Sequence, residues 1–299
     1  MSKVVIVGNS AAGFSFIQAI AEKKPSGVEL VVISKDGSDP YRKDQLIDYI
    51  LGEVEESSLF LADEDFYRVN KISYLKGAEV MRLEAQKKRL LLRDNRRIEY
   101  DYLIIASGRS VELGSIPGKG KDGVILVNSL QDARRLKQRL TISQFVCFVG
   151  GQSQWLNRLA SRLGALNKEI KIINPQRSQD FVNTDNVEWL DNVSVVEFIG
   201  EGPGLQAVKL SNGKIIGVSL VAVFGPSVCN TRFLKDSGVA IRDGFIVVDN
   251  FWRTATQDIF ACGSVCFQGK GSEDFLTWHQ ALEQGKNLAD VLVSFFQGG

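Results

Sequence analysis

The sequence predicts a mixed α/β protein built from two doubly wound domains, the second inserted in the first. Strand-like and helical patterns alternate along most of the 299 residues. Residues 3–20 and 145–166 repeat one plan, in which an apolar run leads into a turn of small residues and then into a helical pattern. A chain of this length can also bury two hydrophobic cores.

The first domain begins with a strand–turn–helix–strand unit. Residues 4–7 form an apolar run, residues 13–23 place apolar side chains on one helical face, and residues 29–34 resemble a second buried strand. The elements expected next are helices at 42–51 and 63–71 and strands at 78–83, 89–92 and 101–106. Residues 107–123 are rich in Gly, Ser and Pro, so we expect the passage between the domains there.

The second domain repeats the unit. We expect a helix at 130–140, a strand at 145–149, a helix at 154–166 and a strand at 170–173. Short strands at 193–199, 205–210 and 220–223 suit a meander that covers this unit. A strand at 246–249 and a last helix at 274–296 close the chain.

Composition narrows the classes of partner and compartment. With 36 basic and 35 acidic residues, the balanced charge favours small molecules or proteins over nucleic acid or an anionic membrane. We expect no membrane span and a cytoplasmic protein, because the apolar runs have only strand length and no leader follows Met1. The spacing of the four cysteines and the single histidine argue against a disulfide framework and a Cys–His metal site.

The first turn has the composition of a nucleotide-binding turn. Gly8, Ser10 and Gly13 have the spacing of G-x-G-x-x-G, between a predicted strand and a predicted helix. Gly8 permits the tight turn, Ser10 is small enough for a pyrophosphate to approach, and Gly13 lets helix and strand pack closely. The alternative is a glycine turn that only packs a helix.

The second turn departs from this pattern at three positions. Gln152 and Trp155 stand where the second and third glycines belong, and Asn174 stands where an acid or a phosphate-binding arginine is expected. We therefore expect no ordinary NADH binding by the second domain.

Six ordered segments give the chain a resemblance to a known family. They are VVIVGNSAAG, YRKDQLIDYILGE, YDYLIIASGRSVELGSIPG, GVILVNSLQDARRL, GFIVVDNFWRTATQDIFACGSV and WHQALEQG. In these segments the chain resembles the two-dinucleotide-binding-domain flavoproteins of the pyridine nucleotide-disulfide oxidoreductase superfamily, most closely the rubredoxin reductase, NADH oxidase and flavoprotein electron-transfer subunit branch. The resemblance implies two Rossmann-like domains: an FAD-binding domain at 1–113 and 245–299, and a degenerate NAD(P)-binding-like domain at 114–244.

The resemblance also implies a set of residues for flavin adenine dinucleotide (FAD). No residue is assigned a catalytic role, and no metal is expected. The residues assigned to the cofactor are Gly8, Ser10, Ala11, Ala12, Gly13, Lys35, Lys43, Val80, Ala106, Ser107, Gly108, Gly263, Ser264, Trp278 and His279.

Two of these residues depart from the family. Lys35 stands where an acid usually meets the adenosine ribose; it could meet a phosphate or simply face water. Ser264 replaces an Asp that usually holds the ribityl and phosphate region, and a serine can still donate and accept hydrogen bonds.

Further redox groups are not expected. The family's dithiol positions hold no cysteine, and Cys262 and Cys266 form only a C-x-x-x-C pair whose first member lies in a predicted buried strand.

We therefore expect an FAD-binding oxidoreductase or electron-transfer subunit that exchanges electrons with a partner protein, possessing a degenerate NAD(P)H site. The alternatives are a stand-alone NAD(P)H-dependent reductase and a non-catalytic nucleotide-binding scaffold. Family members usually continue into a third domain that forms a dimer interface; the sequence ends at Gly299, so we expect neither that domain nor the family-type homodimer.

Overall fold

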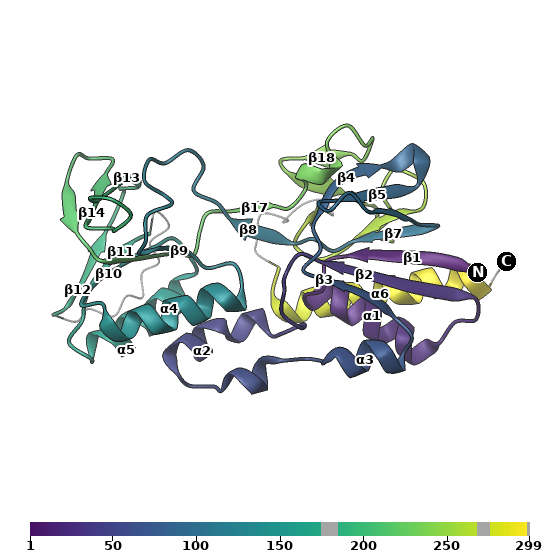
Figure 1. Ribbon diagram of the computed structural model, residues 1–299, viewed down its shortest axis with the longest axis horizontal. Helices are drawn as coiled ribbons and strands as arrows, with labels where there is room; N and C mark the ends of the chain where they lie inside the picture. The colour runs from purple at the N-terminus through teal and green to yellow at the C-terminus, as the bar shows by residue number, and fades with distance from the viewer. Residues whose placement is uncertain (175–184, 268–275, 298–299) are drawn as a thin grey trace. The chain divides into compact units, whose positions relative to one another are not determined.

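The chain folds into two compact units (Figure 1). The computed structural model describes residues 1–174, 185–267 and 276–297. The first unit comprises Met1–Asp44, Ser57–Arg109 and Cys229–Gly299, and the second comprises Gln45–Glu56 and Ser110–Val228. We expected the domain boundaries at 113/114 and 244/245. We did not expect residues 45–56 to belong to the second unit. The roles assigned to the two domains stay predictions.

The first unit is organised around a five-stranded parallel sheet. Its order is β20 (Ile259–Ala261), β7 (Tyr102–Ile105), β1 (Ser2–Val7), β2 (Val28–Ser34) and β3 (Ser73–Lys76). Alternate side chains of β1 face opposite sides, as the period of a strand requires. Val4 and Ile6 belong to one core cluster, whereas Val5 and Val7 belong to another.

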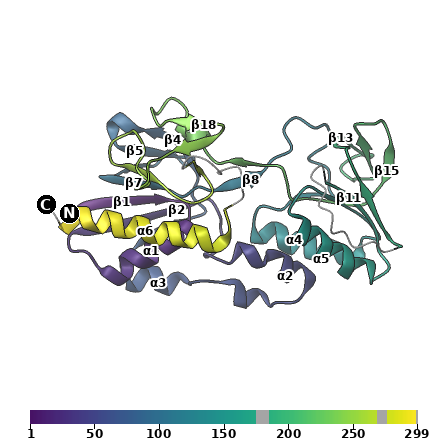
Figure 2. The same cartoon turned by 180° about the vertical axis from the view of Figure 1, so that it is seen from behind.

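Helices cover one face of this sheet and small sheets cover the other. Helices α1 (Ala11–Lys23) and α6 (Trp278–Gln297) lie side by side against β1 and β2 (Figures 1 and 2). The other face packs on two three-stranded sheets. One consists of β4 (Val80–Glu84), β5 (Arg89–Leu92) and β6 (Arg97–Glu99), and the other of β18 (Ile241–Arg242), β19 (Phe245–Val247) and β21 (Cys266–Phe267).

The second unit also has a five-stranded parallel sheet. Its order is β12 (Val187–Leu190), β11 (Glu169–Ile173), β10 (Phe145–Val149), β16 (Leu220–Val223) and β9 (Val124–Leu126). Helices α4 (Leu130–Ile142) and α5 (Ser153–Gly164) complete the βαβ plan, and a meander of β13 (Val195–Ile199), β14 (Ala207–Leu210) and β15 (Ile215–Gly217) packs on the sheet. The predicted fold class is confirmed.

The remaining elements are short. They are α2 (Leu46–Leu51), α3 (Glu64–Val69), β8 (Arg109–Val111), β17 (Ser227–Cys229) and the 3₁₀ turns Lys43–Gln45, Glu56–Leu59, Ala85–Lys87 and Arg232–Leu234. The helix expected at 42–51 is therefore a 3₁₀ turn followed by α2. Ser129 and Asp132 form a capping box that fixes the start of α4. None of the helices that the structure describes combines the length and apolar character needed for a membrane span.

Candidate functional site

Three turns of the first unit meet at the carboxyl edge of its sheet. They follow the neighbouring parallel strands β1, β7 and β20, and contain Gly8–Gly13, Ala106–Gly108 and Gly263–Ser264. Backbone hydrogen bonds hold their starts in register: Gly8 N donates to Ile33 O (2.8 Å), and Ala106 N donates to Val7 O (2.8 Å). This edge is where open α/β sheets bind ligands.

Two glycines are required by close backbone approach. Gly8 has φ +108°, and a Cβ there would lie 2.1 Å from Ala106 O. A Cβ on Gly13 would lie 2.1 Å from Gly8 O. Any side chain at either position would collide with backbone, so these glycines bring the start of α1 against the ends of β1 and β7.

The start of α1 is suited to an anion. Ser10 is its N-cap with φ −115°, but its hydroxyl makes no capping hydrogen bond, and the first turn contains no acid. The N–H groups of Ala11, Ala12 and Gly13 therefore point out of the helix end with partial positive charge. Nearby, the Oδ1 atom of Asn9 is buried and has no hydrogen-bond partner among the residues described.

The second and third turns pack on the first. A Cβ on Gly263 would lie 2.9 Å from the Cβ of Ala12, and a Cβ on Gly108 would lie 3.7 Å from Ser264 Oγ. The structure therefore brings together ten of the assigned residues: Gly8, Ser10, Ala11, Ala12, Gly13, Ala106, Ser107, Gly108, Gly263 and Ser264. A helix start without an acid, close backbone turns and the hydroxyls of Ser10 and Ser264 fit the pyrophosphate of a dinucleotide.

Three other assigned residues have partners of their own. The side chain of Lys35 is 76% exposed, and its Nζ pairs with Glu79 at 2.8 Å. Lys43 lies in the 3₁₀ turn before α2, with its Nζ 5.9 Å from the centre of the Tyr41 ring. Val80 begins β4, opposite Leu92, and packs on the sheet's second core cluster.

Trp278 and His279 are the first two residues of α6. Trp278 is half-buried and His279 is exposed. Farther along the same helix, Gln284 Oε1 accepts a hydrogen bond from Gly263 N at 2.9 Å. The helix thus contacts the third turn through a residue that the sequence patterns did not indicate.

Asn9 was also missed. Its Nδ2 donates to the buried hydroxyl of Tyr67 at 2.7 Å. Burial is the main cause that raises the pKa of Tyr67, so the hydroxyl stays protonated. A polar residue between Gly8 and Ser10 was the available signal, but its partner is 58 positions away in sequence and follows no period.

The second unit has a turn of the same plan after β10. Gly150 has φ +64°, and a Cβ there would lie 2.7 Å from Gly225 O. Gln152 is the N-cap of α5, and its Oε1 accepts a hydrogen bond from Gln154 Nε2 at 3.0 Å. Trp155 is half-buried on the first turn of the helix. Amide and indole side chains therefore occupy the start of α5, where α1 has only small residues.

Asn174 and Cys262, the first cysteine of the C-x-x-x-C pair, are buried. Asn174 follows β11 and is 5% exposed. The four cysteines are free, and burial raises the pKa of Cys262 to about 12 and that of Cys266 well above its usual value. Buried neutral thiols are poor nucleophiles.

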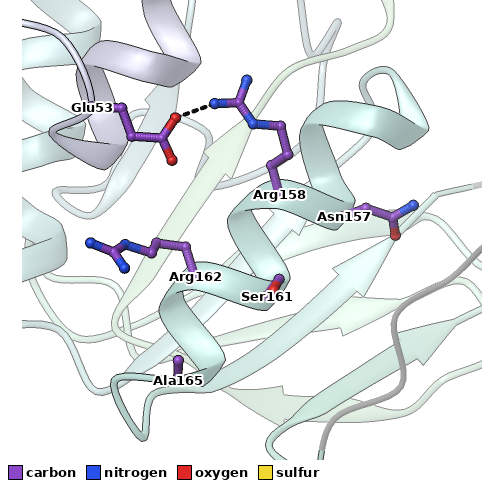
Figure 3. A pocket seen from close by; sticks show the side chains of 6 residues that line it. All are labelled: Glu53, Asn157, Arg158, Ser161, Arg162 and Ala165. Carbon is purple, nitrogen blue, oxygen red and sulfur yellow. Dashed lines mark hydrogen bonds and ion pairs between the residues drawn. The ribbon is translucent and has the colours of Figure 1, made fainter.

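A depression on α5 contains none of the assigned residues. Figure 3 shows its lining, which consists of Glu53, Asn157, Arg158, Ser161, Arg162 and Ala165. Arg158 points toward Glu53 and pairs with both Glu53 and Asp48. These carboxylates neutralise the guanidinium of Arg158, so this arginine offers little net charge to an anionic ligand.

Comparisons with known proteins agree with this geometry. A family model described as pyridine nucleotide-disulphide oxidoreductase matches residues 2–285. The chain is 24% identical to the 3-phenylpropionate/cinnamic acid dioxygenase ferredoxin–NAD(+) reductase component of Photorhabdus laumondii, covering 97% of this chain and 77% of that protein. It is 27% identical to the probable ferredoxin reductase CtmF of Castellaniella defragrans, over 97% and 75% of the two chains.

Solved structures share the fold. The ferredoxin reductase for the CYP199A2 system of Rhodopseudomonas palustris superposes with a TM-score of 0.84 at 20% identity, covering 98% of this chain and 76% of that one. The match of the family model along nearly the whole chain identifies the protein as a member of the pyridine nucleotide-disulphide oxidoreductase family.

Proposed function

We propose that this protein is an FAD-binding oxidoreductase that passes electrons between its flavin and a partner protein. The observation that carries the proposal is the meeting of three small-residue turns at the start of α1. The family assignment supports a flavin as the ligand of that edge.

The residues that would hold the cofactor belong to those turns. The first N–H groups of α1 and the Ser10 hydroxyl would donate to the pyrophosphate. Ser264 would take the place of a family carboxylate and would add a hydroxyl donor without adding negative charge beside the phosphates. Bound FAD supplies the redox centre itself, because none of the described side chains offers a reactive dithiol.

Lys35 contributes little to this proposal. Its exposure and its ion pair with Glu79 favour the solvated role over a contact with a ligand phosphate. Trp278 and His279 are kept as proposed flavin neighbours because they begin the helix whose Gln284 contacts the third turn. Lys43 and Val80 are supported by the family resemblance alone.

The partner we propose is a small electron-transfer protein of the ferredoxin type. Several relatives are named as ferredoxin reductases or as reductase components of dioxygenase systems. Balanced charge and free cysteines suit a protein that works in the reducing cytoplasm, which we also propose as its location.

For the second unit we propose a degenerate nucleotide site. Gln152 and Trp155 fill the start of α5, and Asn174 offers an amide in place of the carboxylate that would hold a ribose. The competing function is a stand-alone NAD(P)H-dependent reductase. The names of the relatives favour it, since several of them are ferredoxin–NAD(+) reductases.

The test begins with the purified protein. Cofactor released by heat is identified by chromatography, and the expected result is one FAD per chain. The holoprotein is then reduced anaerobically with dithionite, freed of excess reductant and mixed with an oxidised [2Fe–2S] ferredoxin. The proposal predicts reoxidation of the flavin with matching reduction of the ferredoxin. A folded protein that neither retains nor binds FAD would refute it.

A further inference from the structure

One short segment ties the second and third turns together. Asn230 N donates to Gly108 O at 2.9 Å, and its Nδ2 donates to Ser107 O at 2.8 Å. In return, Ser107 Oγ donates to Asn230 O at 2.9 Å. The preceding residue, Cys229, reaches the other turn, with its Sγ 3.8 Å from Ser264 O. Two consecutive residues therefore contact both turns.

The hydrogen bonds of Asn230 fix the orientation of the turn. Both carbonyls, of Ser107 and of Gly108, accept from Asn230. A peptide unit is planar and trans, so the N–H of Gly108 points away from the carbonyl of Ser107, and hence away from Asn230. Gly108 has φ +65°, which glycine adopts without strain, so hydrogen bonds rather than a backbone preference select the orientation of this turn. Asn230 thereby holds the carbonyls of Ser107 and Gly108 toward itself and leaves the N–H of Gly108 on the opposite side of the peptide.

The direction of this carbonyl matters at an anion site. Carbonyl oxygens repel a phosphate, whereas N–H groups attract it. If the peptide between Ser107 and Gly108 rotated, its oxygen would exchange places with its N–H group. The amide of Asn230 opposes that rotation because it donates to the oxygen in its present position.

We propose that Asn230 is a positioning residue for the flavin: its side-chain amide holds the 106–108 turn in the orientation that lets the turn bind FAD. This inference rests on the proposed function. Asn230 takes no part in electron transfer, and its effect reaches the cofactor only through Ser107 and Gly108.

The chain provides a matched control for the test. Asn70 Nδ2 donates to Phe66 O at 2.8 Å in the same unit, so it makes the same amide–carbonyl hydrogen bond at the same distance. Asn230→Asp and Asn70→Asp each keep the size of the side chain and remove the Nδ2 donor. Only the first change should disturb the 106–108 turn.

The measurement is the dissociation constant of FAD from apoprotein, followed by flavin fluorescence, together with the visible circular dichroism of the bound flavin. For Asn230→Asp we expect the dissociation constant to rise about tenfold, with an altered dichroism spectrum, because a lost hydrogen bond is replaced by two facing oxygens. For Asn70→Asp we expect less than about a twofold change in the dissociation constant, although the apoprotein melts at a lower temperature.

The possible outcomes distinguish a failure of this inference about Asn230 from a failure of the proposed FAD-binding function. If wild-type protein binds FAD and Asn230→Asp binds it equally well, the inference is wrong and the proposed function stands. If Asn70→Asp weakens binding as much, a general loss of stability explains the effect and the inference is again wrong. If wild-type protein binds no FAD, both are wrong. Should Asn230→Asp fail to fold, Asn230→Ala removes the same Nδ2 donor without adding a charge, and an unchanged dissociation constant in that variant would overturn the inference.

Discussion

The turns after β1 and β10 follow one plan, but they differ in the size of the side chains at the start of the following helix. In both, the first glycine lies against backbone: a Cβ would be 2.1 Å from Ala106 O at Gly8 and 2.7 Å from Gly225 O at Gly150. The third position is Gly13 in one turn and Trp155 in the other, each on the first turn of its helix. The second position is Ser10 in one turn and Gln152 in the other.

This difference separates a folding requirement from a ligand requirement. The first glycine is needed wherever a strand turns sharply beneath a neighbouring strand, so it is present in both units. Space at the second and third positions is needed only where a pyrophosphate must approach the helix start. The first unit keeps that space and the second fills it, which supports our proposal that the first unit holds the cofactor.

The largest expected effect comes from closing the first turn. Gly13→Ala places a Cβ 2.1 Å from Gly8 O, a backbone atom that cannot move aside cheaply. We expect a loss of about 2–4 kcal/mol in the free energy of unfolding and loss of FAD binding. Gly37→Ala is the control, since a Cβ there meets nothing within 4 Å. Urea denaturation and cofactor content measure both effects; a Gly13→Ala protein with normal FAD content would show that the helix start is not the site.

A smaller effect is expected from the unused hydroxyl of the first turn. Ser10→Ala removes a donor that makes no capping hydrogen bond, so the fold should be unaffected while the dissociation constant of FAD rises about fivefold. Ser15→Ala is the matched control on the same helix, because the Ser15 hydroxyl donates to Leu282 O at 2.7 Å. That control should lower the melting temperature and leave FAD affinity unchanged. If Ser15→Ala weakened FAD binding and Ser10→Ala did not, the pyrophosphate would not lie beside Ser10.

A third prediction concerns how the second unit is held together. Glu56 pairs with Arg134 of α4 and accepts a hydrogen bond from Tyr49, and the bond from Arg134 is the main cause that lowers the pKa of Glu56. A carboxylate whose pKa is lowered on folding stabilises the protein above its unfolded pKa, and the contribution is lost as pH falls through the folded pKa. Glu56→Gln should therefore cost about 0.5–1 kcal/mol at pH 7, with the difference from wild type shrinking on acidification. Equal costs at pH 7 and at pH 3 would contradict this assignment of the pKa shift.

The smallest expected effect is an unchanged inability to use NADH when the two missing glycines are restored. Gln152→Gly combined with Trp155→Gly restores two glycines to the second turn, but Asn174 still offers no carboxylate to a ribose. We expect no NADH-dependent reduction of the flavin by this double variant in stopped-flow experiments. Robust reduction would show that Asn174 is not a separate defect.

The sequence predicted the parts of the fold that repeat locally. The turn from Gly8 to Gly13, the strands that flank it and the second βαβ unit follow apolar periods that a single sequence displays. The edge strands β3, β9 and β12 were not predicted, because three or four residues are too few to show a period. The excursion of Gln45–Glu56 into the second unit was also missed, since it depends on ion pairs such as Glu56–Arg134 across 78 positions.

For the candidate site, too, the sequence indicated only the residues that belong to a local pattern. Gly8, Ala106 and Gly263 were found because each follows an apolar strand in a recognisable turn. Asn9, Asn230 and Gln284 were not, because their roles depend on hydrogen bonds to residues far away in sequence. Side-chain amides of this kind have no pattern of their own along the chain.

Anaerobic titration of the flavin-loaded protein with NADH and with NADPH tests the division of roles between the two turns most directly. The readout is the flavin absorbance at about 450 nm. We predict that neither nucleotide bleaches the flavin at near-stoichiometric concentrations, whereas dithionite does so completely. Rapid and complete bleaching by either nucleotide would contradict the account, since it would require a working nucleotide site despite Gln152, Trp155 and Asn174.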